Sequence, residues 1–388
     1  MNRSIDFWLV SIVAMLLVIG LIMVYSASAV VADDWTGSGA RYVVRQLIAL
    51  GVGGALLAGT ALTSTHAMRK YRWVFYVAVV IALVGTYIPG IQHTSKGAAR
   101  WIGFGSVNLQ PSEFAKITVL FALAHFLDRW RGYVSDWRVL LQGAAIPAIP
   151  LVLVLGQPDF GTTVIIAGLC FAMVYIAGLR PGHIALIGGG GIAAGIPILA
   201  LEPYRLQRVL SFLDPFKYED GSGHQVIQSW IAMHSGGLSG QGLGNSMAKL
   251  HFLPEPWTDF IGAVIAEELG WIGLVAVVGL YAMFVWRGLH IARHAKDAFG
   301  MYLAGTITAM VGFEAFFNLA VIMGLVPPKG LVLPFISYGS SAMISHLWAV
   351  GILLSVAAES SPAPIPAGWP DRKATPLRSS GTLPTVSK

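Results

Sequence analysis

Three carboxylates stand close together around the start of a long apolar run, in residues 253–270, LPEPWTDFIGAVIAEELG. Thr258 is a residue type that commonly caps helices, which would place Asp259 at or near the first helical position. The positive end of the helix dipole favours an ionised carboxylate at this place, and an ionised aspartate can act as a general base. Asp259 is therefore the predicted catalytic residue.

Glu267 and Glu268 lie deeper in the same run, about 12 Å beyond Asp259 at 1.5 Å per residue. Carboxylates at this depth in an apolar segment are costly unless they have partners. We predict a buried polar network that positions the helix and that also includes Glu314 and Asn318, one turn apart in a later apolar run. Conduction of protons or ions along these groups is the competing interpretation.

Cationic residues in other polar segments could bind phosphate groups. Arg205 and Arg208 are three residues apart, so a helix would present both on one face suited to phosphate. Lys249 follows a glycine-rich stretch, GGLSGQGLGNS, with G-x-G-x-G spacing and no surrounding βαβ unit. This spacing does not fit a dinucleotide site, and we expect flexible backbone around Lys249 instead.

Two further residues each have a structural and a functional interpretation. Pro111 suits the first turn of a helix, which would place Glu113 and Lys116 one turn apart on a shared face. Lys116 then either forms a structural pair with Glu113 or faces an anionic headgroup together with nearby Arg100. Asp159 lies in a tight Pro–Asp turn, where an aspartate often only bonds its own backbone.

The composition is that of a membrane protein. Hydrophobic residues make up 55% of the 388 residues and charged residues 11%, against about 25% charged residues in soluble domains. The mean hydropathy of +0.69 and the apolar stretches near the ~20 residues that cross a bilayer predict a polytopic membrane protein. The single cysteine, Cys170, excludes an internal disulfide and a cysteine-rich metal site, and no protein metal site is predicted. The net charge of +6 is typical of cytoplasmic loops, and no basic stripe with aromatic residues supports nucleic-acid binding.

Residues 1–359 are predicted to form an all-α membrane domain with ten transmembrane helices. The predicted spans are 7–30, 43–63, 72–89, 112–128, 138–155, 161–178, 183–201, 260–286, 300–325 and 338–358. The first run is longer than the apolar core of a signal peptide, so we expect it to be retained as a span. Glycine-rich stretches at 51–59 and 188–195 are typical of close helix packing.

Lys and Arg residues in alternate short loops predict that both termini are cytoplasmic. The opposite face then carries loops 31–42, 90–111, 156–160, 202–259 and 326–337. Loop 202–259, between the seventh and eighth helices, is too long for a bare connector, which predicts a function outside the cytoplasm. Residues 360–388 are rich in proline and serine and are predicted to be a disordered cytoplasmic tail.

Seven motifs that occur in order resemble the shape, elongation, division and sporulation (SEDS) family of bacterial cell-wall polymerases. They are RWIGFGSVNLQPSEFAK, QPDFGT, RVLSFLDP, GSGHQVIQSWIA, GGLSGQGLGNS, LPEPWTDFIGAVIAEELG and PPKGLVLPFISYGSS. The similarity covers nearly all of the chain except the tail. GLGNS followed by KLHFLPE resembles the division-associated FtsW branch more than the RodA elongation branch.

The resemblance implies a ten-helix bundle with a large extracytoplasmic loop between helices seven and eight. It also implies glycosyl transfer from lipid II, the undecaprenyl-pyrophosphate-linked disaccharide pentapeptide, at the cytoplasmic membrane and the division septum of a bacterium. The implied partners are a class B penicillin-binding protein transpeptidase and other division proteins. No cofactor is implied beyond a divalent cation, Mg²⁺ or Mn²⁺, that could assist at the pyrophosphate.

The resemblance also assigns roles to residues. The Asp of the TDF segment, Asp259, corresponds to the family's catalytic base, which would take the proton of the acceptor sugar's 4-hydroxyl to give a β-1,4 bond. Two positions depart from the family pattern: Trp257 stands where His is common, and Ser340 stands where the SYGGSS run has its second glycine. The full predicted substrate-binding set, whose basic members would stabilise the leaving undecaprenyl pyrophosphate, is Arg100, Trp101, Lys116, Asp159, Arg205, Arg208, Lys249 and Glu255.

Other functions compete with polymerisation. A lipid II flippase would use the polar residues deep in the bundle, whereas a scaffold would only recruit the penicillin-binding protein. A RodA-type elongation polymerase is the alternative within the family. The unexplained charge crowds one face, without the internal repeats and matching broken helices of many transporters, which favours an enzyme at that face.

Overall fold

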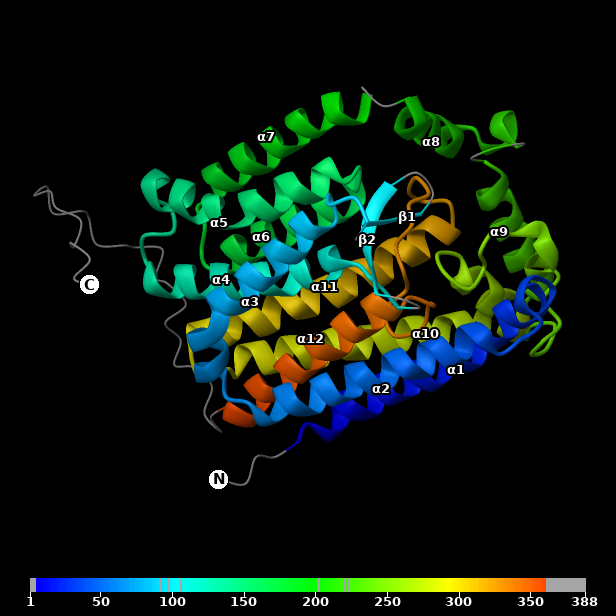
Figure 1. Cartoon of the computed structure of the whole chain (residues 1–388), viewed down its shortest axis with the longest axis horizontal. Helices are drawn as coiled ribbons and strands as arrows, with labels where there is room; N and C mark the ends of the chain where they lie inside the picture. Colours follow the sequence, from blue (N-terminus) through cyan, green and yellow to red (C-terminus); the bar gives the residue numbers. More distant parts are fainter. Residues whose placement is uncertain are drawn as a thin grey trace, which may run out of the picture.

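Helices occupy all of the predicted spans (Figure 1). The computed structural model describes residues 5–360 apart from 91, 96–97, 105–106, 201–202, 220 and 222. The predicted disordered tail, 360–388, lies outside the described residues except for Ser360. The long helices are α1 (Phe7–Thr36), α2 (Arg41–Leu62), α3 (Thr65–Gly85), α4 (Pro111–Arg129), α5 (Trp137–Gly156), α6 (Phe160–Ile176), α7 (Pro181–Ala200), α10 (Ile261–Arg293), α11 (Ala298–Ile322) and α12 (Ser340–Glu359).

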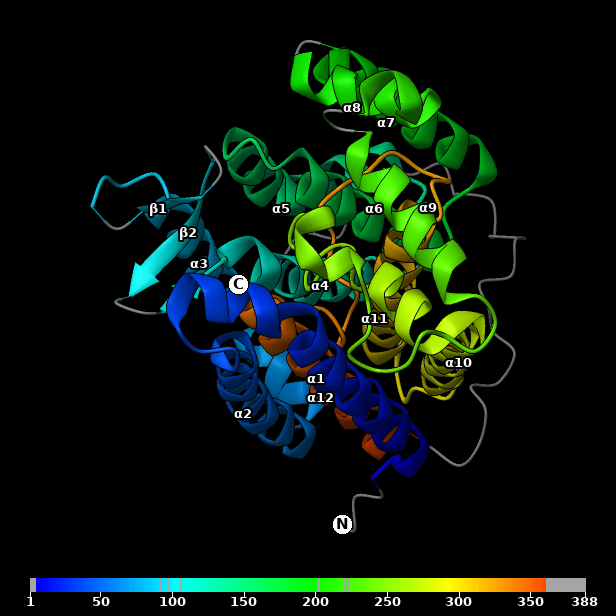
Figure 2. The ribbon, with the colours of Figure 1, turned by 90° about the vertical axis from the view of Figure 1, so that its right-hand side faces the viewer.

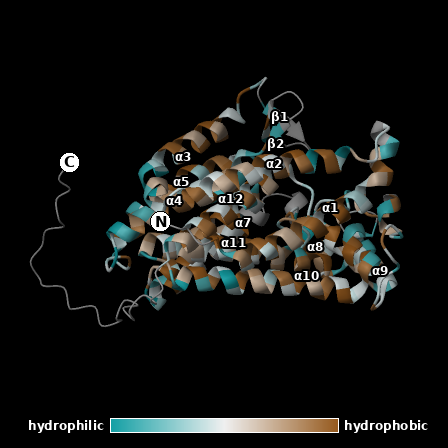
Figure 3. Ribbon diagram, turned by 90° about the horizontal axis from the view of Figure 1, so that it is seen from below, coloured by the Kyte–Doolittle hydropathy of each residue, from teal (hydrophilic) through white to brown (hydrophobic). Residues whose placement is uncertain are grey.

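The chain has the predicted helical, polytopic membrane fold. Within the described residues, six helices are long and apolar enough to cross a membrane: α1, α2, α5, α10, α11 and α12. Helix α6, with 17 residues, is a shorter apolar helix. The number of ten membrane crossings and the direction of each crossing stay predictions. Figure 3 shows apolar residues along the helices and hydrophilic residues gathered towards the ends of the bundle.

The predicted loops of the two membrane faces lie at opposite ends of the bundle (Figure 1). The end that holds the predicted cytoplasmic loops is tied together by ion pairs. Arg69 reaches Asp128 at 3.0 Å and Asp297 at 2.7 Å, and Arg287 reaches Asp6 at 2.8 Å. Two of the predicted cytoplasmic arginines, Arg69 and Arg287, thus have structural partners at this end, while Asp259 and its surroundings lie at the other.

Helices α11 and α12 form the centre of the bundle, with 72% and 83% of their most apolar windows buried. Small residues bring α2 against α12: a Cβ on Gly53 would lie 3.1 Å from the Ile344 Cα, and one on Gly351 would lie 2.7 Å from the Leu57 oxygen. Close packing of the 51–59 stretch is therefore confirmed at Gly53.

Helix α7 does not pack as its glycines predicted. A Cβ added at Gly189, Gly190 or Gly191 would meet no heavy atom within 4 Å among the described residues. Helix α7 runs along the rim of the bundle (Figures 1 and 2), and its described side chains are exposed or half-buried. The expectation of close packing for stretch 188–195 is wrong at these three glycines, because no described residue covers them; only Gly188 has a neighbour, with its added Cβ 3.7 Å from Phe171 Cζ.

Two loops of the predicted outer face carry structure of their own. Loop 90–111 forms a three-stranded antiparallel sheet in the order β1 (Gln92–Ser95), β2 (Ala98–Phe104), β3 (Val107–Leu109). The sheet projects from the side of the bundle in Figure 2, and it is an addition to the predicted all-α class. Loop 202–259 contains α8 (Pro203–Leu213), a 3₁₀ turn (Pro215–Tyr218), α9 (His224–Gly236) and a π turn (Ala248–Phe252).

The long loop is anchored to the membrane domain through α9. The Ser229 hydroxyl donates to the Ile322 oxygen at 2.8 Å, and the Trp230 indole N–H donates to the Met323 oxygen at 3.1 Å. These two bonds satisfy carbonyls at the C-terminal end of α11, which would otherwise be unpaired. The loop is therefore part of the folded body at the end of the bundle that holds Asp259 and not a flexible connector.

Candidate functional site

Asp259 lies just before α10, not at its first helical position. The helix begins at Ile261 with Phe260 as its N-cap, and no side chain caps it. The prediction that Thr258 caps the helix is wrong, because its hydroxyl donates to the Glu255 oxygen at 2.9 Å instead. Two other segments hold this turn: the Ser337 hydroxyl donates to the Thr258 oxygen at 2.6 Å, and Asn318 donates to the Asp259 oxygen. Asp259 is thus fixed by the tertiary structure and not by capping.

The carboxylate of Asp259 faces the turn at residues 327–330, PPKG. A Cβ on Gly330 would lie 2.9 Å from Asp259 Oδ2, so any larger residue at this position would displace the carboxylate. The amide nitrogen of Asn318 donates to the Asp259 oxygen at 2.8 Å and to the Leu331 oxygen at 2.5 Å. One buried side chain of α11 therefore joins the aspartate segment to the PPKG turn. Asp259 itself is half-buried.

Lys329 is a cation at this site that was not singled out from the sequence. Its ammonium donates to the Gly161 oxygen at 2.7 Å and lies over that glycine, where a Cβ would be 2.0 Å from Lys329 Cε. Burial lowers the pKa of Lys329 to about 8, while the nearby charge of Asp159 acts in the opposite direction. The available signal was that Lys329 is the one charged residue in loop 326–337.

Arg208 reaches the same turn from the long loop. One of its guanidinium N–H groups donates to the Pro328 oxygen at 3.3 Å, next to Lys329. Arg205 also lies on α8, but its side chain is outside the described residues. The structure thus brings two cationic residues, Lys329 and Arg208, to the turn that borders the Asp259 carboxylate. Such an arrangement suits a reaction in which negative charge develops on a leaving group beside a base.

Asp159 and Arg100 stand at the edge of this region. Arg100 lies 3.9 Å from Asp159 Oδ1, and its guanidinium also donates to the Pro158 oxygen at 2.7 Å. Asp159 is the N-cap of α6 and accepts from the Thr162 N–H at 3.1 Å and the Thr162 hydroxyl at 2.8 Å. The backbone-bonding interpretation of Asp159 therefore holds. Trp101, half-buried on β2, follows Arg100 in the strand.

Lys116 is enclosed by carboxylates. Its side chain is 2% exposed and lies 2.9 Å from Glu113 Oε2 and 2.6 Å from Glu314 Oε1. The second oxygen of Glu314 is 2.6 Å from His346 Nε2. This geometry is the structural pair predicted for Lys116 and Glu113, extended by two residues. A substrate-binding role for Lys116 stays a prediction, and the ammonium is not presented at the surface.

Glu267 and Glu268 form a separate cluster with the glycine-rich loop. Glu268 is 3.0 Å from Lys249 Nζ and accepts from the Ser26 hydroxyl at 2.6 Å. Glu267 accepts from the Met247 N–H at 3.0 Å. The predicted single network is therefore divided: these two acids bind loop 236–250, whereas Glu314 and Asn318 bind elsewhere.

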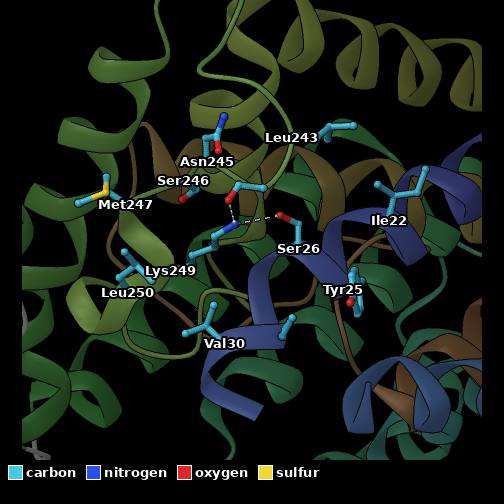
Figure 4. A pocket seen from close by; sticks show the side chains of 12 residues that line it. Ile22, Tyr25, Ser26, Val30, Leu243, Asn245, Ser246, Met247, Lys249 and Leu250 are labelled. Carbon is cyan, nitrogen blue, oxygen red and sulfur yellow. Dashed lines mark hydrogen bonds between the residues drawn. The ribbon is translucent and has the colours of Figure 1, made fainter. Parts of the chain in front are cut away.

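Lys249 lies in this second cluster and is 5% exposed. Its ammonium donates to the Gly244 oxygen at 2.6 Å and to the Ser26 hydroxyl at 3.2 Å (Figure 4). A pocket of about 630 Å³ opens above it between α1 and residues 243–250, lined mostly by apolar side chains. The pocket is lined by neither Asp259 nor the PPKG turn. The predicted contact of Lys249 with the leaving group therefore stays a prediction without support from its placement.

Helix α10 is interrupted at Gly270, whose φ is 69°. The glycine-rich loop fills the interruption. The backbone N–H groups of Gln241 and Gly242 donate to the backbone carbonyl oxygens of Glu267 and Glu268, at 2.9 and 3.0 Å respectively. A Cβ on Gly240 would lie 2.2 Å from the Glu268 oxygen, so its glycine is required for close approach of the two backbones. The stretch is ordered packing and not the flexible backbone expected.

The broken helix does not resemble a transporter site. In substrate-binding broken helices, the freed backbone groups point at the ligand. Here the Trp271 and Ile272 N–H groups donate to the Gly237 and Leu238 oxygens at 3.0 and 3.2 Å, so these backbone groups are already paired. This observation weighs against the flippase alternative.

Trp257 and Glu255 complete the turn before Asp259. Trp257 is 4% exposed and packs on Tyr42 with ring centroids 4.9 Å apart, so it is a packing residue. Glu255 is half-buried with a φ of 49°, and its oxygen accepts from the Thr258 N–H at 3.1 Å. Ser340 is the first residue of α12.

A divalent cation would have few protein ligands. Within the part of the chain that the structure describes, no three His, Cys, Asp or Glu side chains are grouped so that they could hold a metal ion. A cation at the pyrophosphate would therefore take most of its ligands from the substrate and water. Dependence on Mg²⁺ or Mn²⁺ stays a prediction.

Comparisons with known proteins agree with the sequence motifs. A protein-family model described as "Cell cycle protein", which groups FtsW, RodA and SpoVE, matches residues 7–362. The chain is 38% identical to stage V sporulation protein E of Bacillus subtilis over 360 residues, 92% of this chain and 97% of that protein. It is 40% identical to the probable peptidoglycan glycosyltransferase FtsW of Geobacter metallireducens over 348 residues, 87% of this chain and 90% of that protein.

Solved structures share the same fold. A chain from a peptidoglycan synthase complex that coordinates polymerisation and crosslinking superposes with a TM-score of 0.75 and 28% identity, over 91% of this chain and 98% of that chain. The rod shape determining protein RodA of Thermus thermophilus superposes with a TM-score of 0.69 and 26% identity, over 93% of this chain and 99% of that chain.

Proposed function

The chain belongs to the FtsW, RodA and SpoVE family, and we infer that it is a peptidoglycan glycosyltransferase that polymerises lipid II into β-1,4 glycan strands. The observation that carries the mechanism is the geometry at the outer end of the bundle. A half-buried aspartate, Asp259, is held beside a turn that carries Lys329 and is contacted by Arg208.

In the proposed reaction, the 4-hydroxyl oxygen of the acceptor sugar attacks the anomeric carbon of the donor. Asp259 accepts the hydroxyl proton as the new C–O bond forms, a contribution of about 10²–10⁴ in rate. The bond between the anomeric carbon and the pyrophosphate oxygen breaks on the opposite face, which inverts the carbon. The electron pair leaves with the undecaprenyl pyrophosphate, whose growing charge Lys329 and Arg208 stabilise.

The lipid substrate accounts for the place of this site. Asp259 precedes a membrane-spanning helix, so its carboxylate lies where a lipid-anchored sugar would meet water. The undecaprenyl chain can stay among the helices while the sugar reacts at the surface. A soluble pocket for the whole substrate is not required.

We further propose that the enzyme works with a class B penicillin-binding protein and other division proteins at the septum. Support comes from the similarity to a chain of a peptidoglycan synthase complex and to proteins named FtsW. A fluorescent fusion that accumulates along the side wall instead of the septum would favour the RodA-type role.

The test of catalysis compares the purified wild type with Asp259→Asn, each in nanodiscs with its transpeptidase partner and labelled lipid II. Glycan strands from the wild type and none from the variant are expected. Equal amounts of polymer from both would reject Asp259 as the base. Translocation of lipid II in liposomes without polymer would instead support the flippase, and polymer made only by the partner would support the scaffold.

A further inference from the structure

Two arginines at the outer end of α2 have no place in the mechanism so far. Arg41 and Arg45, in RYVVRQ, are one helical turn apart and share a face of α2. They lie at the start of α2, where Tyr42 packs on Trp257 of the Asp259 segment. A charge rule that places Lys and Arg in the cytoplasm does not explain them.

Neither side chain has a structural partner within the described residues. Arg41 is exposed and Arg45 is half-buried, and among these residues no ion pair or side-chain hydrogen bond holds either guanidinium. Other arginines that the structure describes are held in this way, for example Arg69 by two aspartates. A half-buried guanidinium at a membrane edge without a partner is costly, and this cost points to an anion that is not part of the chain.

The arginine pair is fixed relative to Asp259 by the residues between and beside them. Tyr42 packs on Trp257, with ring centroids 4.9 Å apart, and on Tyr338 at 5.0 Å. Gln46, 1% exposed, donates to the Ser337 oxygen at 3.1 Å and accepts from the Gly339 N–H at 3.3 Å. Because Trp257 is two residues before Asp259, the outer end of α2 and the catalytic turn form one packed unit.

The chemistry of the proposed function requires two diphosphates at once. Both reacting molecules are lipid-linked saccharides: the donor loses its diphosphate, and the acceptor keeps its own. The donor diphosphate is attached to the carbon under attack, so it must lie next to the base, where Lys329 and Arg208 are found. The acceptor diphosphate is two sugar rings away from the attacking hydroxyl, so it must bind at a second place farther from Asp259.

We propose that Arg41 and Arg45 bind the diphosphate of the acceptor lipid. This inference rests on the proposed function and deepens it by giving the retained diphosphate its own site. Arg208 and the helix that carries the arginine pair contact opposite ends of the same loop. Arg208 donates to the Pro328 oxygen, whereas Gln46, next to Arg45 on α2, is bonded to Ser337 and Gly339. Asp259 lies between them, as a reaction that joins two such molecules demands.

Glu255 is the acidic neighbour that this site must accommodate. Its charge and those of Arg41 and Arg45 all act on the Tyr42 hydroxyl, so the carboxylate lies in the neighbourhood of the pair. Two guanidinium groups against one carboxylate leave this neighbourhood with a positive balance for a diphosphate. Guanidinium groups match phosphate oxygens in bidentate geometry, which a lysine would not reproduce.

The kinetic test separates the two substrates. A lipid-linked glycan oligomer with a blocked terminal 4-hydroxyl serves as donor, and lipid II serves as acceptor, in nanodiscs with the transpeptidase partner. Arg45→Gln is expected to raise the KM for the acceptor about tenfold, while kcat and the KM for the donor change less than twofold. Arg45→Lys should recover only part of the loss. Arg131→Gln, an exposed arginine at the opposite end, is the matched control and should change neither constant.

Bulk phospholipid is the other possible source of the same phosphate chemistry. The measurements are therefore repeated in nanodiscs of phosphatidylcholine and of phosphatidylglycerol. An effect of Arg45→Gln that appears only with the anionic lipid would overturn the proposal, because the pair would then merely anchor the helix to headgroups. An equal rise in both KM values, or no rise, would overturn it as well.

A binding measurement keeps the proposal testable apart from turnover. Native mass spectrometry of Asp259→Asn in detergent should show two bound diphosphate lipids at saturation, and one when Arg41→Gln and Arg45→Gln are added. Unchanged stoichiometry would refute the second site. The count is taken with lipid II whose 4-hydroxyl is blocked, so it stays readable even if Asp259→Asn is active; such activity would refute the catalytic assignment alone, and the two failures can be told apart. Thermal unfolding of each variant shows that the fold is retained.

Discussion

Removing the Lys329 charge, by pH or by mutation, tests the leaving-group site most directly. The pKa of this lysine is lowered from 10.5 to about 8, chiefly by burial. If the charged form stabilises the departing diphosphate, activity is present below this pKa and is lost as the pH rises through it. About half of the charge is gone at pH 8 and about nine-tenths at pH 9, which predicts a tenfold fall in rate per pH unit above that point.

The fall should be seen in kcat/KM, which reports the free enzyme, more than in kcat. A bound diphosphate raises the pKa of a neighbouring ammonium and so protects its charge. Lys329→Met should lower kcat/KM at pH 7 by about 10²–10³-fold, the usual cost of removing one group that stabilises transition-state charge. Its remaining activity should no longer decline near pH 8.

The same variant should be more stable than the wild type at neutral pH. A lysine pKa lowered from 10.5 to about 8 corresponds to about 3 kcal/mol against the charged form in the folded state. The variant also loses the hydrogen bond from Lys329 to the Gly161 oxygen, which costs about 1 kcal/mol. The net gain in the free energy of unfolding is therefore about 2 kcal/mol. Because the folded pKa is the lower one, this cost acts below pH 8 and fades as the pH rises from 8 to 10.5.

The assay is the initial rate of strand formation at low concentrations of fluorescent lipid II, between pH 6.5 and 9.5, with thermal unfolding measured in parallel. Lys70→Met, an exposed lysine at the opposite end of the bundle, is the matched control. The reasoning fails if the wild type shows no decline near pH 8. It also fails if Lys329→Met keeps the same alkaline decline, since another group would then be titrating.

Three further substitutions test the packing around the site. Gly330→Ala should lower kcat about 10²-fold with little change in melting temperature, because its Cβ would lie 2.9 Å from the catalytic carboxylate. Gly168→Ala is the control for polymer synthesis, since a Cβ at Gly168 would meet no heavy atom within 4 Å. Glu268→Gln should destabilise the fold by about 3–5 kcal/mol by leaving buried Lys249 unpaired, and Lys249→Met added to it should restore much of the loss in thermal unfolding. Gly240→Ala should lower the melting temperature far more than Gly168→Ala, since its φ is 81° and its Cβ would lie 2.2 Å from the Glu268 oxygen; equal melting temperatures would contradict the proposed close approach.

The positions of the helices could be predicted from local sequence. The predicted span 300–325 is helix Ala298–Ile322, and 138–155 is helix Trp137–Gly156. Runs of apolar residues between polar and Pro/Gly breaks are sufficient here, because a backbone in hydrocarbon must form its own hydrogen bonds. Boundaries were missed where helices continue into polar residues, as in α3, which begins at Thr65 and not at 72.

Pairing between distant segments could not be predicted in this way. Glu267 and Glu268 were expected to be partners of Glu314, yet they bind a loop that enters the break at Gly270. The sequence gives no sign of which glycine interrupts a helix. Nor does hydropathy reveal that α7 lies at the rim, since exposed and buried apolar helices have similar composition in a membrane protein.

The sequence by itself determined that the chain is a helical membrane protein, that it carries the motifs of a cell-wall polymerase family, and that Asp259 stands at the start of a span. Only the tertiary structure decided what each cation does. Lys116 and Lys249 form ion pairs with buried carboxylates, whereas Lys329 and Arg208 meet at the turn beside Asp259. The physical reason is that a charge buried in an apolar interior must pair with whichever opposite charge the fold brings within about 3 Å, and that neighbour is not written in local sequence.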